Sequence, residues 1–251
     1  MRGLARFLAV VSVVVAVGGC ATTRVEETRI RPEGIPTGFI NKTMDVNGAK
    51  RAYVVYVPRD YTPHKAWPLI MFLHGMGERG SDGLQQTQVS IATAIRWHAD
   101  RFPCLVVMPQ CPGDVHWDKA ADDIDTALAN TRSEYNVDPD RIYLTGLSMG
   151  GFATWSYGAH RLDVYAALMP ICGGGDPNDA PRLAKAPIWA FHGADDKTVP
   201  PQRSREMVEA VKKAGGKINY TEYPGVPHNS WDKTYGDPDA IKWLLSQRKG
   251  R

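Results

Sequence analysis

The stretch that decides the fold is Arg141-Ile-Tyr-Leu-Thr-Gly-Leu-Ser-Met-Gly-Gly-Phe152. Ile142 and Leu144 recur at every second position, which predicts a short strand. The strand breaks at Gly146-Leu-Ser-Met-Gly150, and a small-residue segment of helical character follows. A nucleophile elbow needs this Gly-x-Ser-x-Gly order, because Ser148 would sit in a strained turn where a Cβ on either side would block the approach of strand and helix. A glycine-rich turn with an incidental serine is the alternative, and the rest of the chain must decide.

Outside this stretch, apolar strands and amphipathic helices alternate from residue 68 to the end. This order predicts an α/β fold with a doubly wound, mostly parallel sheet. Before it, the alternating runs 39–46 and 51–58 flank Asn47-Gly48, a strong signal for an N-terminal antiparallel hairpin. A helix is expected over 86–100. The other predicted strands cover 68–73, 104–108, 165–171, 187–191 and 218–223.

The amino-acid composition limits the classes of function that the protein can have. The chain has 251 residues, 43% hydrophobic and 23% charged, which suits one sizeable core. Its formal charge of +3 comes without a Lys/Arg cluster, so nucleic acid is not an expected partner. No stretch after residue 20 is long and apolar enough to span a bilayer.

The N-terminus has the features of an export signal. Two arginines precede the apolar run 7–17, which is short for a transmembrane helix but suits a signal peptide over 1–19. Val17-Gly-Gly-Cys20 resembles the lipobox of bacterial lipoproteins, which implies a lipidated Cys20 in the cell envelope. Ala21 is not the Asp that favours inner-membrane retention, so the outer membrane is expected. An ordinary signal peptide is the alternative. Residues 20–38 are polar and predict a tether to a catalytic domain over 39–251.

Three cysteines remain beyond Cys20. In an oxidising compartment an odd number allows one disulfide and one free thiol. The favoured pair is Cys111–Cys172, because both follow strand ends. Three buried thiols, Cys104 included, are the competing expectation.

A serine nucleophile needs a base and a carboxylate, in the chain order Ser, Asp or Glu, His. Three histidines follow Ser148, namely His160, His192 and His228. His160 falls within the predicted helix, and His192 precedes any suitable acid, so His228 is the predicted base. The acid is one of two neighbours, Asp195 or Asp196.

Two further sets of residues are candidates for the site. The oxyanion hole needs two backbone N–H groups, and we expect them from Met76, in a glycine-rich loop after a strand, and from Met149. Trp117 and Trp231 follow strand ends and either line a substrate pocket or pack in the interior. His74 and His192, each followed by glycine at a strand end, are expected to brace loops.

At this point a family resemblance is evident. Residues 192–200 resemble the His-Gly-x-x-Asp-x-x-Val-Pro signature of α/β-hydrolases, which implies that Asp196 is the acid. The chain further resembles secreted carbohydrate esterases, including feruloyl and acetyl-xylan esterases, some of which are labelled predicted peptidases. The motifs that carry this second resemblance are His74–Gly80, Pro109–Pro112, Asp138–Gly151 and Pro170–Gly174.

The predicted function is a lipid-anchored serine carboxylesterase acting on small or polysaccharide-linked esters. The alternative within catalysis is a peptidase of prolyl-oligopeptidase type, which is disfavoured because no β-propeller or long lid precedes the hydrolase region. A non-catalytic binding protein is disfavoured because no triad member is missing. A dienelactone-type hydrolase is disfavoured because position 148 is Ser, not Cys. No cofactor or metal is expected, since His and Cys lack zinc-type spacing. The membrane is expected as a partner only through the lipid.

Overall fold

The computed structural model describes residues 34–250. The predicted signal peptide, Cys20 and most of the tether lie outside this range. The chain divides after Gly34, and the residues from Ile35 onward belong to one unit. Among the described helices, none has the length and apolar character needed to cross a membrane.

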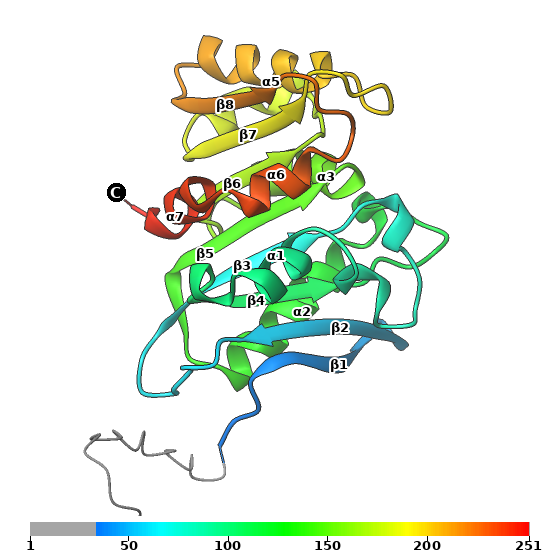
Figure 1. Cartoon of the computed structure of the whole chain (residues 1–251), viewed down its shortest axis with the longest axis vertical. Helices are drawn as coiled ribbons and strands as arrows, with labels where there is room; N and C mark the ends of the chain where they lie inside the picture. Colours follow the sequence, from blue (N-terminus) through cyan, green and yellow to red (C-terminus); the bar gives the residue numbers. More distant parts are fainter. Residues whose placement is uncertain (1–33, 251) are drawn as a thin grey trace, which may run out of the picture. The chain divides into compact units, whose positions relative to one another are not determined.

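The unit is built on one eight-stranded sheet with the order β1-β2-β4-β3-β5-β6-β7-β8 (Figure 1). β1 and β2 form the predicted hairpin, and Asn47 and Gly48 at its turn have φ of 53° and 82°. β2 runs antiparallel to β4, while the pairs from β4 to β8 are parallel. The predicted fold class is confirmed. The strands are β1 Gly38–Val46, β2 Ala49–Val57, β3 Trp67–Leu73, β4 Leu105–Pro109, β5 Val137–Leu147, β6 Ala167–Ile171, β7 Ile188–Gly193 and β8 Ile218–Tyr223.

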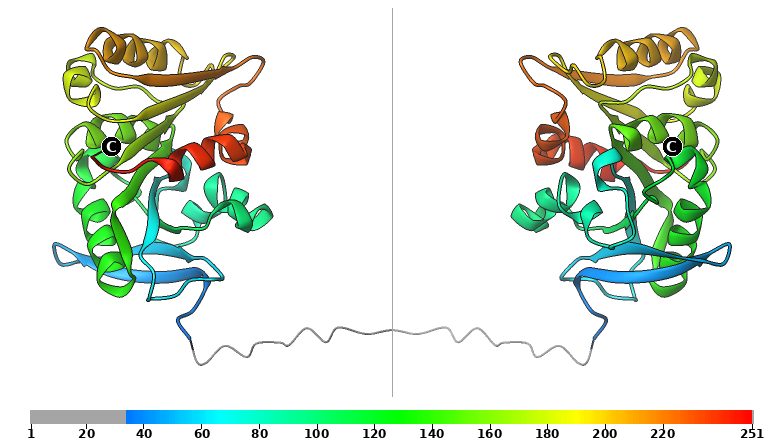
Figure 2. Two further views of the ribbon diagram at one scale, coloured as in Figure 1. Left: turned by 90° about the vertical axis from the view of Figure 1, so that its left-hand side faces the viewer. Right: turned by 90° about the vertical axis from the view of Figure 1, so that its right-hand side faces the viewer.

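Helices cover both faces of the sheet (Figure 2). Residues of α2 to α5 pack in one apolar core, and residues of α1, α6 and α7 pack in the other. Within β3, Met71 belongs to the first core and its neighbour Phe72 to the second, because successive strand residues point to opposite faces. The helices are α1 Ile91–Trp97, α2 Ala121–Glu134, α3 Met149–Ala159, α4 Ala180–Leu183, α5 Gln202–Lys213, α6 Ser230–Gly236 and α7 Pro238–Ser246.

Four elements differ from the prediction. The helix expected over 86–100 shortens to α1, because Ser90 has φ of 69°, which a continuous right-handed helix excludes. β5 begins at Val137, before the alternating residues Ile142 and Leu144 that predicted this strand, since Trp67 pairs with Val137 across the sheet. α4 and α6 had not been predicted.

The favoured disulfide prediction is wrong, because Cys104, Cys111 and Cys172 are all buried free thiols. Cys111 packs in the core on one face of the sheet and Cys172 in the core on the other. Burial raises the pKa of each of these two thiols to about 12, so both stay protonated and unreactive at neutral pH.

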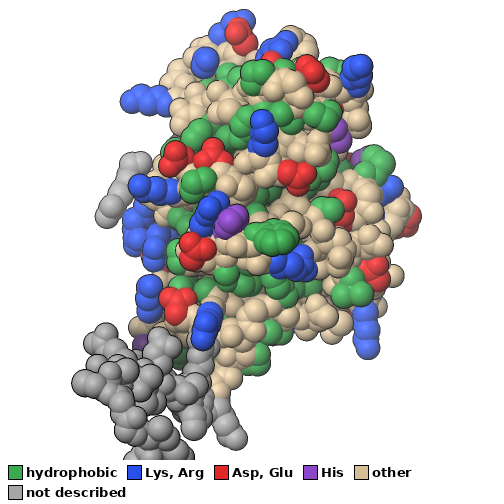
Figure 3. Space-filling model, in the orientation of Figure 1, with side chains coloured by type: hydrophobic (Ala, Val, Ile, Leu, Met, Phe, Trp, Pro, Cys, Tyr) green, Lys and Arg blue, Asp and Glu red, His purple; other side chains and the backbone are tan. Residues whose placement is uncertain are grey.

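The space-filling view of one face shows positive and negative side chains interspersed (Figure 3). On this face, no broad basic surface of the kind that binds nucleic acid stands out.

Candidate active site

Ser148 occupies a sharp turn between β5 and α3. Its φ of 52° lies in the left-handed region, a conformation that costs on the order of 1–3 kcal/mol for a non-glycine residue. A Cβ on Gly150 would lie 1.9 Å from the carbonyl oxygen of Leu73. A Cβ on Gly146 would lie 2.5 Å from the carbonyl oxygen of Gly150. The two glycines are therefore required where α3 approaches β3 and β5, and the turn presents the serine at the carboxyl edge of the sheet.

Three side chains from separate loops meet at this edge. The Oγ of Ser148 lies 3.0 Å from Nε2 of His228, and Nδ1 of His228 lies 2.6 Å from Oδ2 of Asp196. Asp196 follows β7 and His228 follows β8, and parallel strands bring such ends to one edge. In the tautomer that suits both contacts, Nδ1–H donates to the carboxylate and Nε2 accepts from the serine hydroxyl.

The carboxylate of Asp196 is held from its other side by the backbone. The residue is 4% exposed, and its Oδ1 accepts N–H bonds of 2.9 Å from both Thr198 and Val199. Its neighbour Asp195 is exposed. Of the two carboxylates predicted from the sequence, Asp195 and Asp196, the one that contacts the His228 imidazole is thus Asp196.

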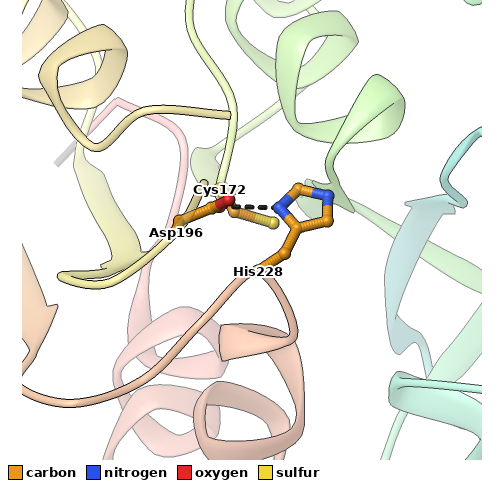
Figure 4. A group of neighbouring side chains, drawn as sticks. All are labelled: Cys172, Asp196 and His228. Atoms are coloured by element: carbon orange, nitrogen blue, oxygen red, sulfur yellow. Dashed lines mark hydrogen bonds and ion pairs between the residues drawn. The ribbon is translucent and has the colours of Figure 1, made fainter. Parts of the chain in front are cut away.

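Cys172 lies beside this pair (Figure 4). Its Sγ, a carboxylate oxygen of Asp196 and a ring nitrogen of His228 all lie within 4.8 Å of one another. Metal binding would need a thiolate and would take the imidazole from the carboxylate. Because the buried thiol is protonated at neutral pH and Asp196 and His228 are hydrogen-bonded, the arrangement suits proton transfer better than ion binding.

Two backbone N–H groups are available beside the serine. Met76 and Met149 are the first residues of η1 (Met76–Glu78) and of α3, and the first N–H groups of a helix have no partner within it. The N–H of Gly75 is occupied, since it donates to Oε2 of Glu78 at 2.9 Å. Both predicted oxyanion residues line one cavity with Ser148. Their role stays a prediction.

The cavity around Ser148 has a volume of about 670 Å³. Its charged carboxylates are Glu78 and Asp118, and no lysine or arginine stands among the described residues that line it. Burial raises the pKa of Glu78 above its ordinary value. The lining residues are Gly75, Met76, Gly77, Glu78, His116, Trp117, Asp118, Leu147, Ser148, Met149, Phe152, Ala153, Ser156, Thr198, Val199, His228 and Trp231.

A comparison with known protein families shows to which family the chain belongs. A model of the dienelactone hydrolase family matches residues 106–237, more than half of the chain. The chain belongs to the dienelactone hydrolase family. The expectation that Ser148 disfavours a dienelactone-type hydrolase is therefore wrong as to family, although the residue at the elbow is serine and not cysteine.

Relatives of this dienelactone hydrolase family member include esterases. A bifunctional acetylxylan esterase/xylanase of Neocallimastix patriciarum is 28% identical over 207 residues, which cover 76% of this chain and 30% of that protein. The crystal structure of a thermostable esterase has 37% identity and a TM-score of 0.77, covering 84% of this chain and 63% of that one. A feruloyl esterase module of Clostridium thermocellum, at 19% identity and a TM-score of 0.68, covers 83% of this chain and 88% of its own, and shows the fold alone.

The chain spans less than half the length of the curated relatives named first. A putative carboxymethylenebutenolidase of Methylorubrum extorquens is 31% identical over 119 residues, covering 42% of this chain and 40% of that protein. The activity of this family member is therefore inferred from its site.

The two predicted tryptophans both line the cavity. Trp117 is 2% exposed, donates from Nε1 to the carbonyl oxygen of His74 at 3.0 Å, and packs against that imidazole. Trp231 meets the ring of His228 edge-on, with 5.3 Å between ring centroids. Trp117 thus serves mainly as a buried packing residue, while Trp231 contacts the predicted base directly.

The remaining histidines differ in their surroundings. His74 accepts from the N–H of Cys111 at 2.9 Å, and burial lowers its pKa to about 4. His160 is exposed and contacts Arg182. His192 is buried, and its Nε2 lies 3.2 Å from Oδ2 of Asp196, a contact to the site that the sequence analysis missed. Glu78 was missed as well, although it belongs to the quoted His74–Gly80 motif.

Proposed function

We propose that this protein is a serine carboxylesterase that works through an acyl-enzyme on Ser148. The observation that carries the proposal is the continuous hydrogen-bonded series from Ser148 through His228 to Asp196, at the wall of an open cavity. A hydroxyl becomes an effective nucleophile when such a base takes its proton.

The geometry gives each residue a step. Oγ of Ser148 attacks the ester carbonyl carbon while Nε2 of His228 takes its proton. The N–H groups of Met76 and Met149 stabilise the oxyanion, and Asp196 stabilises the imidazolium. His228 then gives its proton to the departing alcohol. Water, deprotonated by the same imidazole, attacks the acyl-enzyme and releases the acid and the free serine.

The charge of the cavity favours neutral esters. Glu78 and Asp118 contribute negative charge, and the described lining offers no lysine or arginine against it. A substrate with its own carboxylate, as the name carboxymethylenebutenolide implies, would meet repulsion there. The apolar and aromatic part of the lining, including Phe152 and Trp231, suits an acetyl or an aromatic acyl group.

A second cavity offers space on the alcohol side. It has a volume of about 680 Å³, is lined by residues of the loops 194–198 and 225–228, and shares Thr198 and His228 with the first. Because His228 protonates the leaving oxygen, the alcohol departs near this imidazole. Feruloyl or acetyl esters on plant polysaccharides are therefore the proposed substrates, and the acetylxylan esterase named above supports this choice.

Activity against a substrate panel tests the function. We expect hydrolysis of p-nitrophenyl acetate, methyl ferulate and acetylated xylan, weak activity on an anionic lactone, and none on a prolyl-peptide amide. Faster cleavage of the amide than of the esters would replace the esterase proposal with a peptidase. No turnover of any compound, in protein that folds, would favour a binding protein.

We also propose that the protein is exported and anchored in the bacterial outer membrane by a lipid on Cys20. The support is the sequence alone: the apolar run before Cys20, the Gly18-Gly19 pair and Ala21. Cys20→Ser is expected to give an exported protein that leaves the membrane fraction without detergent. Mass spectrometry is the check, and an unmodified internal Cys20 in the mature wild-type protein would contradict the anchor.

A further inference from the structure

A second imidazole reaches the carboxylate of Asp196. His192 is fully buried and lies near the end of β7. Its Nε2 lies 2.9 Å from the carbonyl oxygen of Val199 and 3.2 Å from Oδ2 of Asp196. The carbonyl oxygen can only accept, so Nε2 carries a hydrogen and donates it to Val199, while Oδ2 of Asp196 lies beside the same N–H. The carboxylate thus accepts from two backbone N–H groups and from His228, and the N–H of His192 lies against it as a further polar contact.

The other nitrogen of His192 connects to a serine. Nδ1 lies 2.7 Å from Oγ of Ser204, and the same Oγ lies 3.0 Å from the carbonyl oxygen of Gly173. The hydroxyl has one hydrogen, so it donates to a neutral ring, or to Gly173 when the ring is charged. Burial lowers the pKa of His192, which favours the neutral ring at neutral pH.

Gly173 links this pair to the nucleophile helix. A Cβ on Gly173 would lie 2.5 Å from the carbonyl carbon of Gly151, in the first turn of α3. His192, Ser204 and Gly173 thus pack in turn between the acid loop and the helix that begins after Ser148, with the Ser204 hydroxyl in contact with both the imidazole and the Gly173 carbonyl. The hydrogen bonds between Asp196 and His228 and between His228 and Ser148 connect the acid loop to the start of the same helix by a second route.

We propose that His192 is a positioning residue for the Ser148–His228–Asp196 series, which orients the Asp196 carboxylate through Nε2 and fixes the acid loop against α3 through Ser204. The proposal rests on the proposed function. A plain brace of the loop, without influence on the carboxylate, is the alternative.

The proposal predicts an effect on proton transfer. An N–H directed at Oδ2 draws negative charge from the carboxylate, so its loss makes Asp196 hold the proton of His228 more strongly. The acidic limb of the kcat/KM profile should then move to higher pH. Other titratable groups nearby stay unchanged: the Cys172 thiol is protonated, and Glu222 on β8 is paired with Arg205.

The test compares His192→Ala, His192→Gln and His74→Ala on p-nitrophenyl acetate. We expect His192→Ala to lower kcat about 10- to 100-fold with little change in KM, and to move the acidic limb upward by on the order of half a pH unit. His192→Gln, whose amide can replace the Nε2 donor, should recover most of kcat and the wild-type limb. His74→Ala also removes a buried imidazole, but one bonded to Gly75 and Cys111, and should not move the limb.

An unmoved limb in folded His192→Ala, or a Gln variant no better than Ala, would overturn the proposal. Ser204→Ala is a smaller buried change that keeps the test decisive where His192→Ala does not fold. It should lower kcat several-fold, and an unchanged kcat would refute the tie to α3. Failure of the proposed function looks different, since Ser148→Ala would then keep the wild-type rate.

Discussion

Ser148→Ala is expected to lower kcat by on the order of 10³-fold or more while KM changes little. In the proposed mechanism His228 deprotonates the Ser148 hydroxyl, which then forms the acyl-enzyme, so its removal should end covalent catalysis. The cavity and the N–H groups of Met76 and Met149 remain, and in the same proposal they account for the residual rate over water. The substitution removes one side-chain oxygen and adds no new strain to the backbone at residue 148, so the fold should survive it.

The measurement is steady-state hydrolysis of p-nitrophenyl acetate, with a melting curve for each variant. A fluorophosphonate should label the wild-type protein at Ser148, located by mass spectrometry, and should not label the variant. Ser133→Ala, on the exposed side of α2, is the matched control and should keep the wild-type rate. Near-wild-type turnover in Ser148→Ala, or a label on another serine, would remove this residue from the mechanism.

The meeting of Ser148, His228 and Asp196 at one edge of the sheet could be predicted because each residue is marked by local sequence. The Gly-x-Ser-x-Gly order around Ser148 is a local sequence pattern, although the backbone contacts that require its glycines include Leu73 of the neighbouring strand. Asp196 and His228 follow strands, and parallel strands bring their ends together whatever the details of the helices. The hairpin was predictable for the same reason, since Asn47-Gly48 determines its turn locally.

The features that were missed depend on distant contacts. The role of His192 requires that its ring, Ser204 and Gly173 meet from three segments. The error over Cys111 and Cys172 arose because a strand end does not say which face of the sheet a side chain will join. The helix expected over 86–100 was shortened by the backbone conformation of Ser90, a polar residue whose φ the apolar pattern cannot show.

Asp196→Asn and Asp195→Asn form the comparison that decides the acid. Both substitutions remove one negative charge from the same loop, so a general electrostatic effect would be similar in both. Asp196→Asn should lower kcat by on the order of 10³- to 10⁴-fold, because an amide N–H facing Nδ1 of His228 favours the tautomer that cannot accept the serine proton. Asp195→Asn should be mild on p-nitrophenyl acetate, since its side chain is exposed.

The severity of Asp196→Asn also depends on its burial. Two backbone N–H groups and His228 donate to this carboxylate, with the N–H of His192 beside it, and an amide accepts at one atom only. Donors on one side of the group would therefore face the new NH₂. The residue should therefore affect stability as well as kcat, and a melting curve separates the two. His228→Ala should lower kcat as severely as Ser148→Ala. The double variant should be little worse than either single variant, because the effects of residues that act together in one proton transfer are not additive. A crippled Asp195→Asn beside an active Asp196→Asn would move the acid by one residue and would contradict the 2.6 Å contact between Asp196 and His228 as the working arrangement.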